Sequence, residues 1–73
     1  MKVNTADVTF NIVTVEDRTT WAYGLNWGQC AYLMRYLMDS VKDPRAFTVL
    51  VVNEFGIVTH MVPLDKLCEI AHV

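Results

Sequence analysis

Apolar residues recur every three or four positions between Asn26 and Lys42, which is the spacing of one face of an α-helix. This stripe consists of Trp27, Cys30, Ala31, Met34, Leu37, Met38 and Val41. Asn26 suits the N-cap, because its side-chain oxygen can accept a hydrogen bond from a free N–H of the first turn. Asp43-Pro44 would end the helix, since proline disfavours the helical conformation of the residue before it. The pattern therefore predicts a long helix over residues 26–42.

Alternation of apolar and polar residues predicts strands before this helix. Residues 7–15 alternate at first, and the parity then shifts at Val13. This shift predicts a bulge near Ile12, or a strand that passes from one packing surface to another. A short second strand is predicted over residues 19–23, and Gly24 is expected to end it.

The strongest strand signal follows the helix, where residues 46–52 and 57–62 flank the turn Asn53-Glu54-Phe55-Gly56. Gly56 can adopt the left-handed conformation that follows a type I turn in a bulged hairpin. Both faces of the first of these strands are apolar, which is typical of a strand in the middle of a covered sheet. The long helix can cover one face. We expect the other face to require the C-terminal segment, a second subunit or a partner.

Pro63 ends this hairpin and suits the first turn of a short C-terminal helix. The apolar stripe of that helix consists of Leu64, Leu67, Cys68 and Ala71. Together, these patterns predict a single α+β domain over residues 1–73, in the order β(β)αββα. We expect a small antiparallel sheet of roughly three to four strands, packed against one long helix with a short C-terminal helix.

Composition narrows the functional classes. The chain is 53% hydrophobic, which indicates a folded domain. Its net charge is −2 and its basic residues are scattered, so direct nucleic-acid binding is disfavoured and a protein partner fits better. The first residues lack the apolar region of a signal peptide, and no stretch approaches the ~20 apolar residues of a membrane helix. We therefore expect a cytoplasmic protein.

No group of residues carries recognisable catalytic chemistry. Cys68 and His72 have the spacing of a helical metal pair, but a zinc site needs further ligands, and no second paired motif is present. Cys30 and Cys68 lie among apolar helical positions, which predicts buried, reduced thiols. We expect a protein that is not an enzyme and that binds no metal or cofactor.

Aromatic residues gather around the long helix. Trp21 and Trp27 are expected either in the core or at a contact surface. Two tyrosines and an arginine point away from the apolar stripe of the helix, and Tyr, Trp and Arg are enriched at interface hot spots. The predicted protein-binding residues are Arg18, Tyr32, Arg35, Tyr36, Asp39 and Lys42.

Across its length, the chain MKVNTADVTF…WAYGLNWGQC…AHV resembles the small bacteriophage-encoded transcription regulators that bind the host bacterial RNA polymerase. The resemblance lies in length and general character, and it involves no specific motif that would assign individual residues. It implies inhibition of promoter-dependent initiation, contact near the amino terminus of the β′ subunit, and antitermination as a further activity. A phage-encoded protein of this kind would act in the host bacterial cytoplasm.

Two alternatives follow from the residues themselves. The chain could be a small nucleic-acid-binding protein that stacks bases on its tyrosines and meets phosphates with Arg35, Lys42 and Arg45. It could also be a self-associating structural module or homodimer, in which the second apolar face of the strand over 47–52 pairs with another copy.

Overall fold

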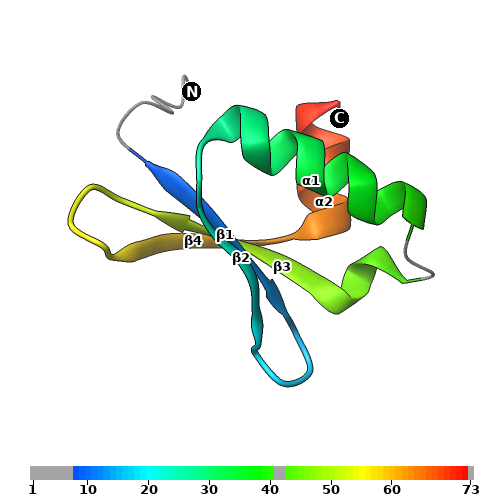
Figure 1. The fold of residues 1–73 in the computed structure, drawn as a ribbon, viewed down its shortest axis with the longest axis horizontal. Coiled ribbons are helices and arrows are strands. Elements are labelled where there is room, and N and C mark those ends of the chain that lie inside the picture. The colour runs from blue at the N-terminus through cyan, green and yellow to red at the C-terminus, as the bar shows by residue number, and fades with distance from the viewer. Residues whose placement is uncertain (1–7, 41–42, 73) are drawn as a thin grey trace.

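The computed structural model describes residues 8–40 and 43–72 (Figure 1). Its elements are β1 (Thr9–Thr14), β2 (Thr20–Leu25), α1 (Trp27–Ser40), the 3-10 turn η2 (Pro44–Ala46), β3 (Phe47–Val52), β4 (Val58–Pro63) and α2 (Leu64–Ala71). This order confirms the α+β class and the arrangement that the sequence predicts. Within the described residues, no helix is long and apolar enough to cross a membrane.

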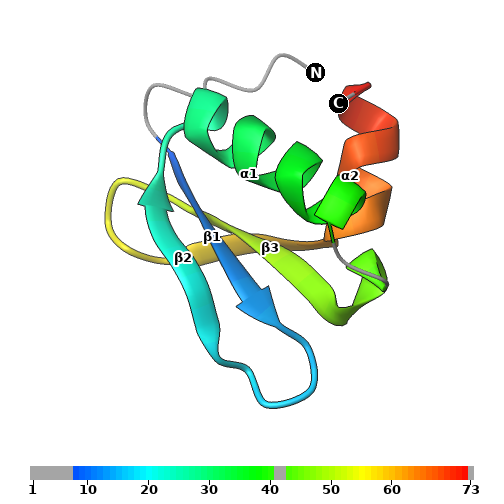
Figure 2. The ribbon, with the colours of Figure 1, turned by 45° about the vertical axis from the view of Figure 1, so that its right-hand side comes forward.

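The four strands form one antiparallel sheet in the order β2-β1-β3-β4. The central strands are therefore β1 and β3, while β2 and β4 are the edges. Both helices lie on the same side of this sheet (Figures 1 and 2). No element of the described ranges covers the opposite side, which we call the open face of the sheet.

The central strands pair one to one, from Thr9 opposite Val52 to Thr14 opposite Phe47. Ile12 lies opposite Val49, and both side chains are buried under the helices. Because side chains alternate along a strand, Leu50 points to the open face, where it is half-buried. The expected two-sided apolar strand is thus confirmed. The C-terminal segment does not cover its second face, because α2 packs on the same side as α1.

The first hairpin confirms the second strand but corrects its end. β2 continues through Gly24 to Leu25, and Gly24 has a positive φ of 66°. The Gly24 N–H donates to Asn11 Oδ1 at 2.9 Å, which holds this irregular backbone in the sheet. The register between β1 and β2 shifts on both sides of Ile12. Because β1 pairs regularly with β3, the additional residues belong to β2, and the bulge expected near Ile12 lies in the neighbouring strand.

The structure confirms Asn26 as the residue that caps α1, which the described residues show from Trp27 to Ser40. Asn26 Oδ1 accepts the Gln29 N–H at 2.8 Å. The residues Val41 and Lys42 of the predicted helix lie outside the described residues. Cys30, Met34 and Leu37 are buried as expected, whereas Met38 is 39% exposed. Leu33 packs against the core as well, so the buried stripe lies closer to Leu33 than the sequence pattern indicated.

The second hairpin and the C-terminal helix follow the predictions closely. Gly56 has a φ of 78°, and its N–H donates to the Asn53 carbonyl at 3.0 Å. The Asn53 side chain accepts the N–H groups of Phe55 and Ile57, each at 2.9 Å, which closes the turn. α2 begins directly after Pro63. Of its predicted apolar stripe, Leu64 and Cys68 are buried, while Leu67 and Ala71 are half-buried.

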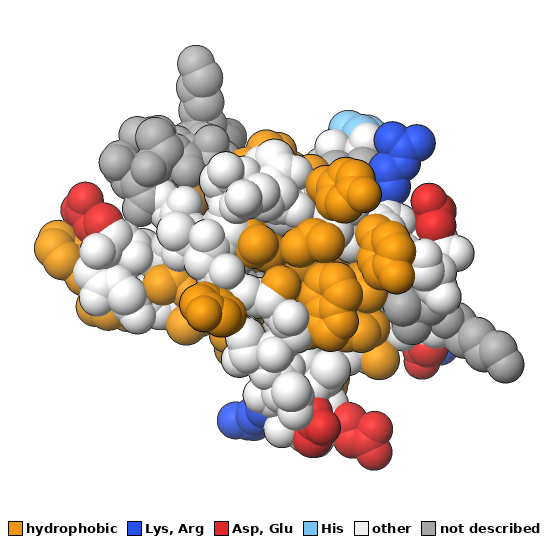
Figure 3. Space-filling view, viewed as in Figure 1, with side chains coloured by type: hydrophobic (Ala, Val, Ile, Leu, Met, Phe, Trp, Pro, Cys, Tyr) orange, Lys and Arg blue, Asp and Glu red, His pale blue; other side chains and the backbone are white. Residues whose placement is uncertain are grey.

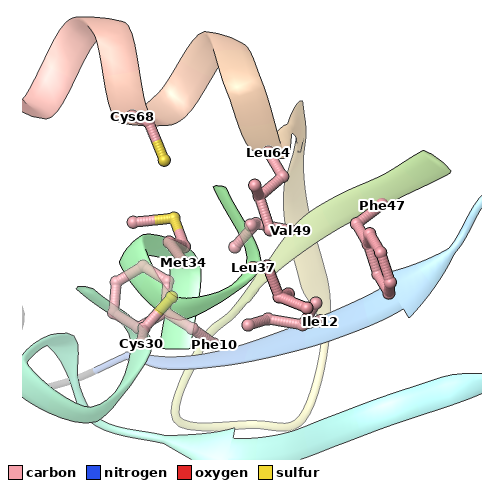
Figure 4. Packing of buried hydrophobic residues seen from close by; sticks show 9 residues of the cluster. All are labelled: Phe10, Ile12, Cys30, Met34, Leu37, Phe47, Val49, Leu64 and Cys68. Carbon is pink, nitrogen blue, oxygen red and sulfur yellow. The ribbon is translucent and has the colours of Figure 1, made fainter. Parts of the chain in front are cut away.

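One hydrophobic cluster joins both helices to the central strands (Figure 4). It consists of Phe10, Ile12, Cys30, Met34, Leu37, Phe47, Val49, Leu64 and Cys68. None of the described polar or charged residues is buried with them. The core is therefore held by apolar packing, and polar chemistry is confined to the surface.

Candidate functional site

Tyr32, Arg35, Tyr36 and Asp39 share the exposed side of α1, which we call the tyrosine face. Their spacing of three and four residues places them in one stripe, on the side away from the buried Met34. Tyr32 is 72% exposed and Tyr36 is 52% exposed, one helical turn apart. Arg35 and Asp39 are exposed as well. The helix therefore displays two aromatic rings flanked by charges of opposite sign.

An open hollow of about 400 Å³ lies beside the tyrosine face. It is lined by Leu25, Gly28, Gln29, Tyr32 and Leu33. Gly28 has no side chain to fill this space, and the leucines give the hollow an apolar lining. Figure 3 shows hydrophobic side chains gathered on this side of the molecule, over α1 and the strands beneath it. The tyrosine face is therefore continuous with the apolar hollow, because Tyr32 belongs to both.

The two tryptophans differ in their packing. Trp27 is half-buried and packs against Phe10, with ring centroids 5.4 Å apart and a tilt of 58°. Trp21 meets Phe47 edge to face, with centroids 6.2 Å apart, and remains 42% exposed. Trp27 thus belongs to the margin of the core, whereas Trp21 on β2 adds partly exposed aromatic surface.

Arg18, the predicted binding residue outside the helix, lies in the β1–β2 turn at the end of the hairpin away from α1 (Figures 1 and 2). Its φ of 56° is left-handed. The Asp17 carboxylate accepts hydrogen bonds from the Thr14 hydroxyl and from the Thr19 N–H, and these hold the pKa of Asp17 below its usual value. Arg18 is therefore separated from the tyrosine face, while Lys42 lies outside the described residues.

The sequence interpretation did not identify Leu25, Gln29 or Leu33 as part of this surface. A signal for the first two exists, because Asn26 followed by Gln29 has the spacing of a capping box, and Leu25 precedes the cap where a hydrophobic staple would lie. Leu33 carried no such signal. Its position beside the hollow depends on how α1 is rotated over the sheet.

The buried thiols do not form a reactive site. Cys30 from α1 and Cys68 from α2 face one another across Met34 (Figure 4). Burial, and then the charge on Cys68, raises the pKa of the Cys30 thiol to about 11. Burial, and then Asp65, raises the pKa of Cys68. Both thiols therefore stay protonated at neutral pH, and a protonated thiol is a poor nucleophile.

The spacing of Cys68 and His72 does not produce a metal site either. Cys68 is buried, whereas His72 is exposed and takes the left-handed C-cap position of α2. The backbone N–H of His72 meets the Cys68 carbonyl, so this contact involves no side chain. Among residues 8–40 and 43–72, no group of three or more His, Cys, Asp or Glu side chains is placed to hold a metal ion.

Comparison of the chain with models of known protein families, with curated proteins and with solved structures finds no match. On the described surface, the tyrosine face and the adjoining hollow bring exposed aromatic rings and an apolar depression together.

Proposed function

We propose that this protein is a non-enzymatic regulator that binds a larger protein through the tyrosine face of α1. The observation that carries this proposal is the pair Tyr32 and Tyr36, 72% and 52% exposed, next to an apolar hollow. Tyrosines contribute large contact areas at interfaces, while their hydroxyls can still form hydrogen bonds. Burial of both rings and of the hollow by a partner would remove this apolar surface from water.

The charges on the tyrosine face favour a protein partner over a nucleic acid. Arg35 and Asp39 lie one turn apart and carry opposite charges, so this face has little net charge. A surface that binds phosphates gains its affinity from clustered positive charge, whereas the whole chain carries a net charge of −2. A mixed polar rim around apolar contacts is typical of protein interfaces.

The candidate partner is bacterial RNA polymerase, with contact near the amino terminus of its β′ subunit. Support comes from the resemblance of the chain, in length and character, to small bacteriophage-encoded regulators of the host polymerase. Binding there would inhibit promoter-dependent initiation, and antitermination is a further activity of the same complex. The regulator would then act through contact alone.

The test is a titration of purified bacterial RNA polymerase with the labelled protein. The double substitution Tyr32→Ala and Tyr36→Ala is expected to raise the Kd at least about tenfold, because truncation of an interface hot spot commonly costs more than about 1 kcal/mol. Phe55→Ala is the matched control. Phe55 is 77% exposed in the β3–β4 turn, away from α1, and its truncation is expected to leave the Kd unchanged.

Unchanged affinity of a correctly folded double variant would exclude the tyrosine face as the contact surface. Absence of polymerase binding by the unaltered protein at moderate salt would reject the proposed partner. Salt-dependent binding of a labelled oligonucleotide would instead favour the nucleic-acid alternative. Circular dichroism of each variant separates loss of contact from loss of fold.

A further inference from the structure

The open face of the sheet is formed by the side chains that the strands direct away from the helices. Residues opposite one another in neighbouring strands share a face, so these side chains form three rows across β1, β3 and β4. The rows are Thr9–Val52–Val58, Asn11–Leu50–Met61 and Val13–Thr48–Pro63. Each row therefore has two apolar residues and one uncharged polar residue.

The strands carry none of the charged residues that usually keep such a face in water. None of β1, β2, β3 and β4 contains Asp, Glu, Lys or Arg. His60 of β4 lies opposite Val51, which packs against the core on the helix side. The exposed face of an antiparallel sheet is commonly polar. Here the open face can be covered without the cost of taking a charged side chain out of water.

The two edges of the sheet are protected against pairing, unlike its open face. The register between β2 and β1 shifts on both sides of Ile12, and Gly24 has a φ of 66°. β4 carries a bulge at Thr59 and ends in Pro63, which has no N–H to donate. Bulges and prolines discourage the addition of another strand at an edge. The sheet is therefore poorly suited to sideways extension, and its open face is the surface available for association.

The open face has the dimensions of a small interface. Four strands about 4.8 Å apart, each of six residues at about 3.4 Å, cover about 19 Å by 20 Å, or about 400 Å² in flat projection. Side chains that stand up from the strands increase the accessible area, and Met61 alone is 70% exposed. Two such faces would bury roughly 1,000 Å² together, which is the lower limit for a specific interface. This area predicts a weak, reversible dimer.

We propose that the open face packs against the open face of a second copy of this chain, about a twofold axis that lies between the two sheets. A second copy offers a sheet of the same size, with the same twist and the same lack of charge. Two twisted sheets pack face to face with their strands about 30° apart. A charged partner, by contrast, would find no counter-charge on the strands. Leu50, next to the centre of the sheet, would then be covered by apolar side chains of the second copy.

The dimer leaves the proposed binding surface free. Both helices lie on the side of the sheet away from the open face (Figures 1 and 2). Face-to-face packing therefore places the two copies of α1 on opposite outer surfaces of the dimer. The tyrosine faces stay exposed, so dimer formation and the proposed regulator function can be tested separately.

The first test measures the association of the full chain by sedimentation from about 10 μM to about 1 mM, the range expected for a small interface. A reversible equilibrium between monomer and dimer is expected. Met61→Lys places a charge on the open face and is expected to raise the dimer Kd at least about tenfold, because this charge would lose water in the dimer. Ile70→Lys is the matched control with the same change of net charge. Ile70 is 61% exposed on α2, on the helix side of the sheet, and its substitution is expected to leave the Kd unchanged.

The second test locates the interface by methyl NMR across the same concentrations. The methyl signals of Val13, Leu50 and Val52 are expected to shift as the dimer forms, because these half-buried side chains would lose contact with water. The methyl signals of Leu33, beside the hollow on α1, are expected to remain constant. Shifts confined to Leu33 would place self-association at the tyrosine face and overturn the proposal.

A chain that remains monomeric at about 1 mM would also overturn the proposal, since an interface of roughly 1,000 Å² should be occupied there. So would a dimer that Met61→Lys leaves intact, or one that Ile70→Lys weakens equally. If Met61→Lys does not fold, Val58→Lys repeats the test, because Val58 lies on the same face and is 45% exposed. Failure of polymerase binding would leave these results unaffected, because the dimer does not use α1.

Discussion

At the start of α1, the side chains of Asn26 and Gln29 each accept a hydrogen bond from the backbone N–H of the other residue. The Gln29 N–H donates to Asn26 Oδ1 at 2.8 Å, and the Asn26 N–H donates to Gln29 Oε1 at 3.0 Å. This is a reciprocal capping box, which satisfies backbone donors that the first turn of a helix leaves free. It fixes where α1 begins, and thereby how the tyrosine face is presented.

Loss of the cap is expected to destabilise the domain. Asn26→Ala should lower the free energy of unfolding by about 1 kcal/mol, because a helical N–H loses its acceptor. Urea denaturation of Asn26→Ala, Gln29→Ala and the double variant gives a mutant cycle. Since the two side chains act as one unit, the double variant should lose less free energy of unfolding than the two single variants lose together. Strictly additive losses would show that the two hydrogen bonds act independently.

Met34 and Met38 offer a comparison within one helix. Met34 is fully buried between the sheet and α2, whereas Met38 is 39% exposed. Met34→Ala should lower the free energy of unfolding by about 2–5 kcal/mol through the cavity it creates, a large share of what a domain of this size possesses. Met38→Ala should cost less than about 1 kcal/mol. Chemical denaturation measures both values, and equal losses would place Met38 in the core.

The sequence predicted the elements well because local signals specified them. Asn26 marked the helix start and Gly56 marked the hairpin turn, and each makes its characteristic contacts in the structure. The apolar faces of β3 likewise predicted its central position in the sheet. Local chemistry could not predict the end of β2, because Gly24 continues the strand only with the support of Asn11, which is distant along the chain.

The candidate site was predictable only in part. Helical spacing alone brings Tyr32, Arg35, Tyr36 and Asp39 together, so their common face followed directly from the pattern. The position of Arg18 depends on the direction in which the first hairpin extends, which periodicity does not encode. The hollow between Leu25 and Leu33 likewise requires β2 and α1 to be placed next to each other. The sequence interpretation missed these features because they depend on how the elements are placed in space, and not on residue type.

Gly28 and Gly56 should respond to alanine in opposite directions. Gly56 has a φ of 78°, and an added Cβ would meet no neighbouring atom within 4 Å. Gly56→Ala should therefore lower the free energy of unfolding by about 1 kcal/mol, through backbone strain alone. Gly28 lies in the first turn of α1, and an added Cβ would approach Asn26 Oδ1 at 3.4 Å, an ordinary contact distance. Gly28→Ala should therefore raise the free energy of unfolding by about 0.4–1 kcal/mol. Thermal denaturation measures the signs, and destabilisation by both substitutions would contradict the account of Gly28.

Cys30 should make the stability of the fold depend on alkaline pH. Its pKa rises from 9.0 to about 11, mainly through burial, so the unfolded chain loses this proton before the native chain does. The native state then holds more protons, and the free energy of unfolding falls as pH rises from about 9 to about 11. Urea denaturation across this interval should show a shallower fall for Cys30→Ala than for the unaltered chain, whatever its absolute stability. Parallel curves would mean that the Cys30 thiol ionises equally in both states.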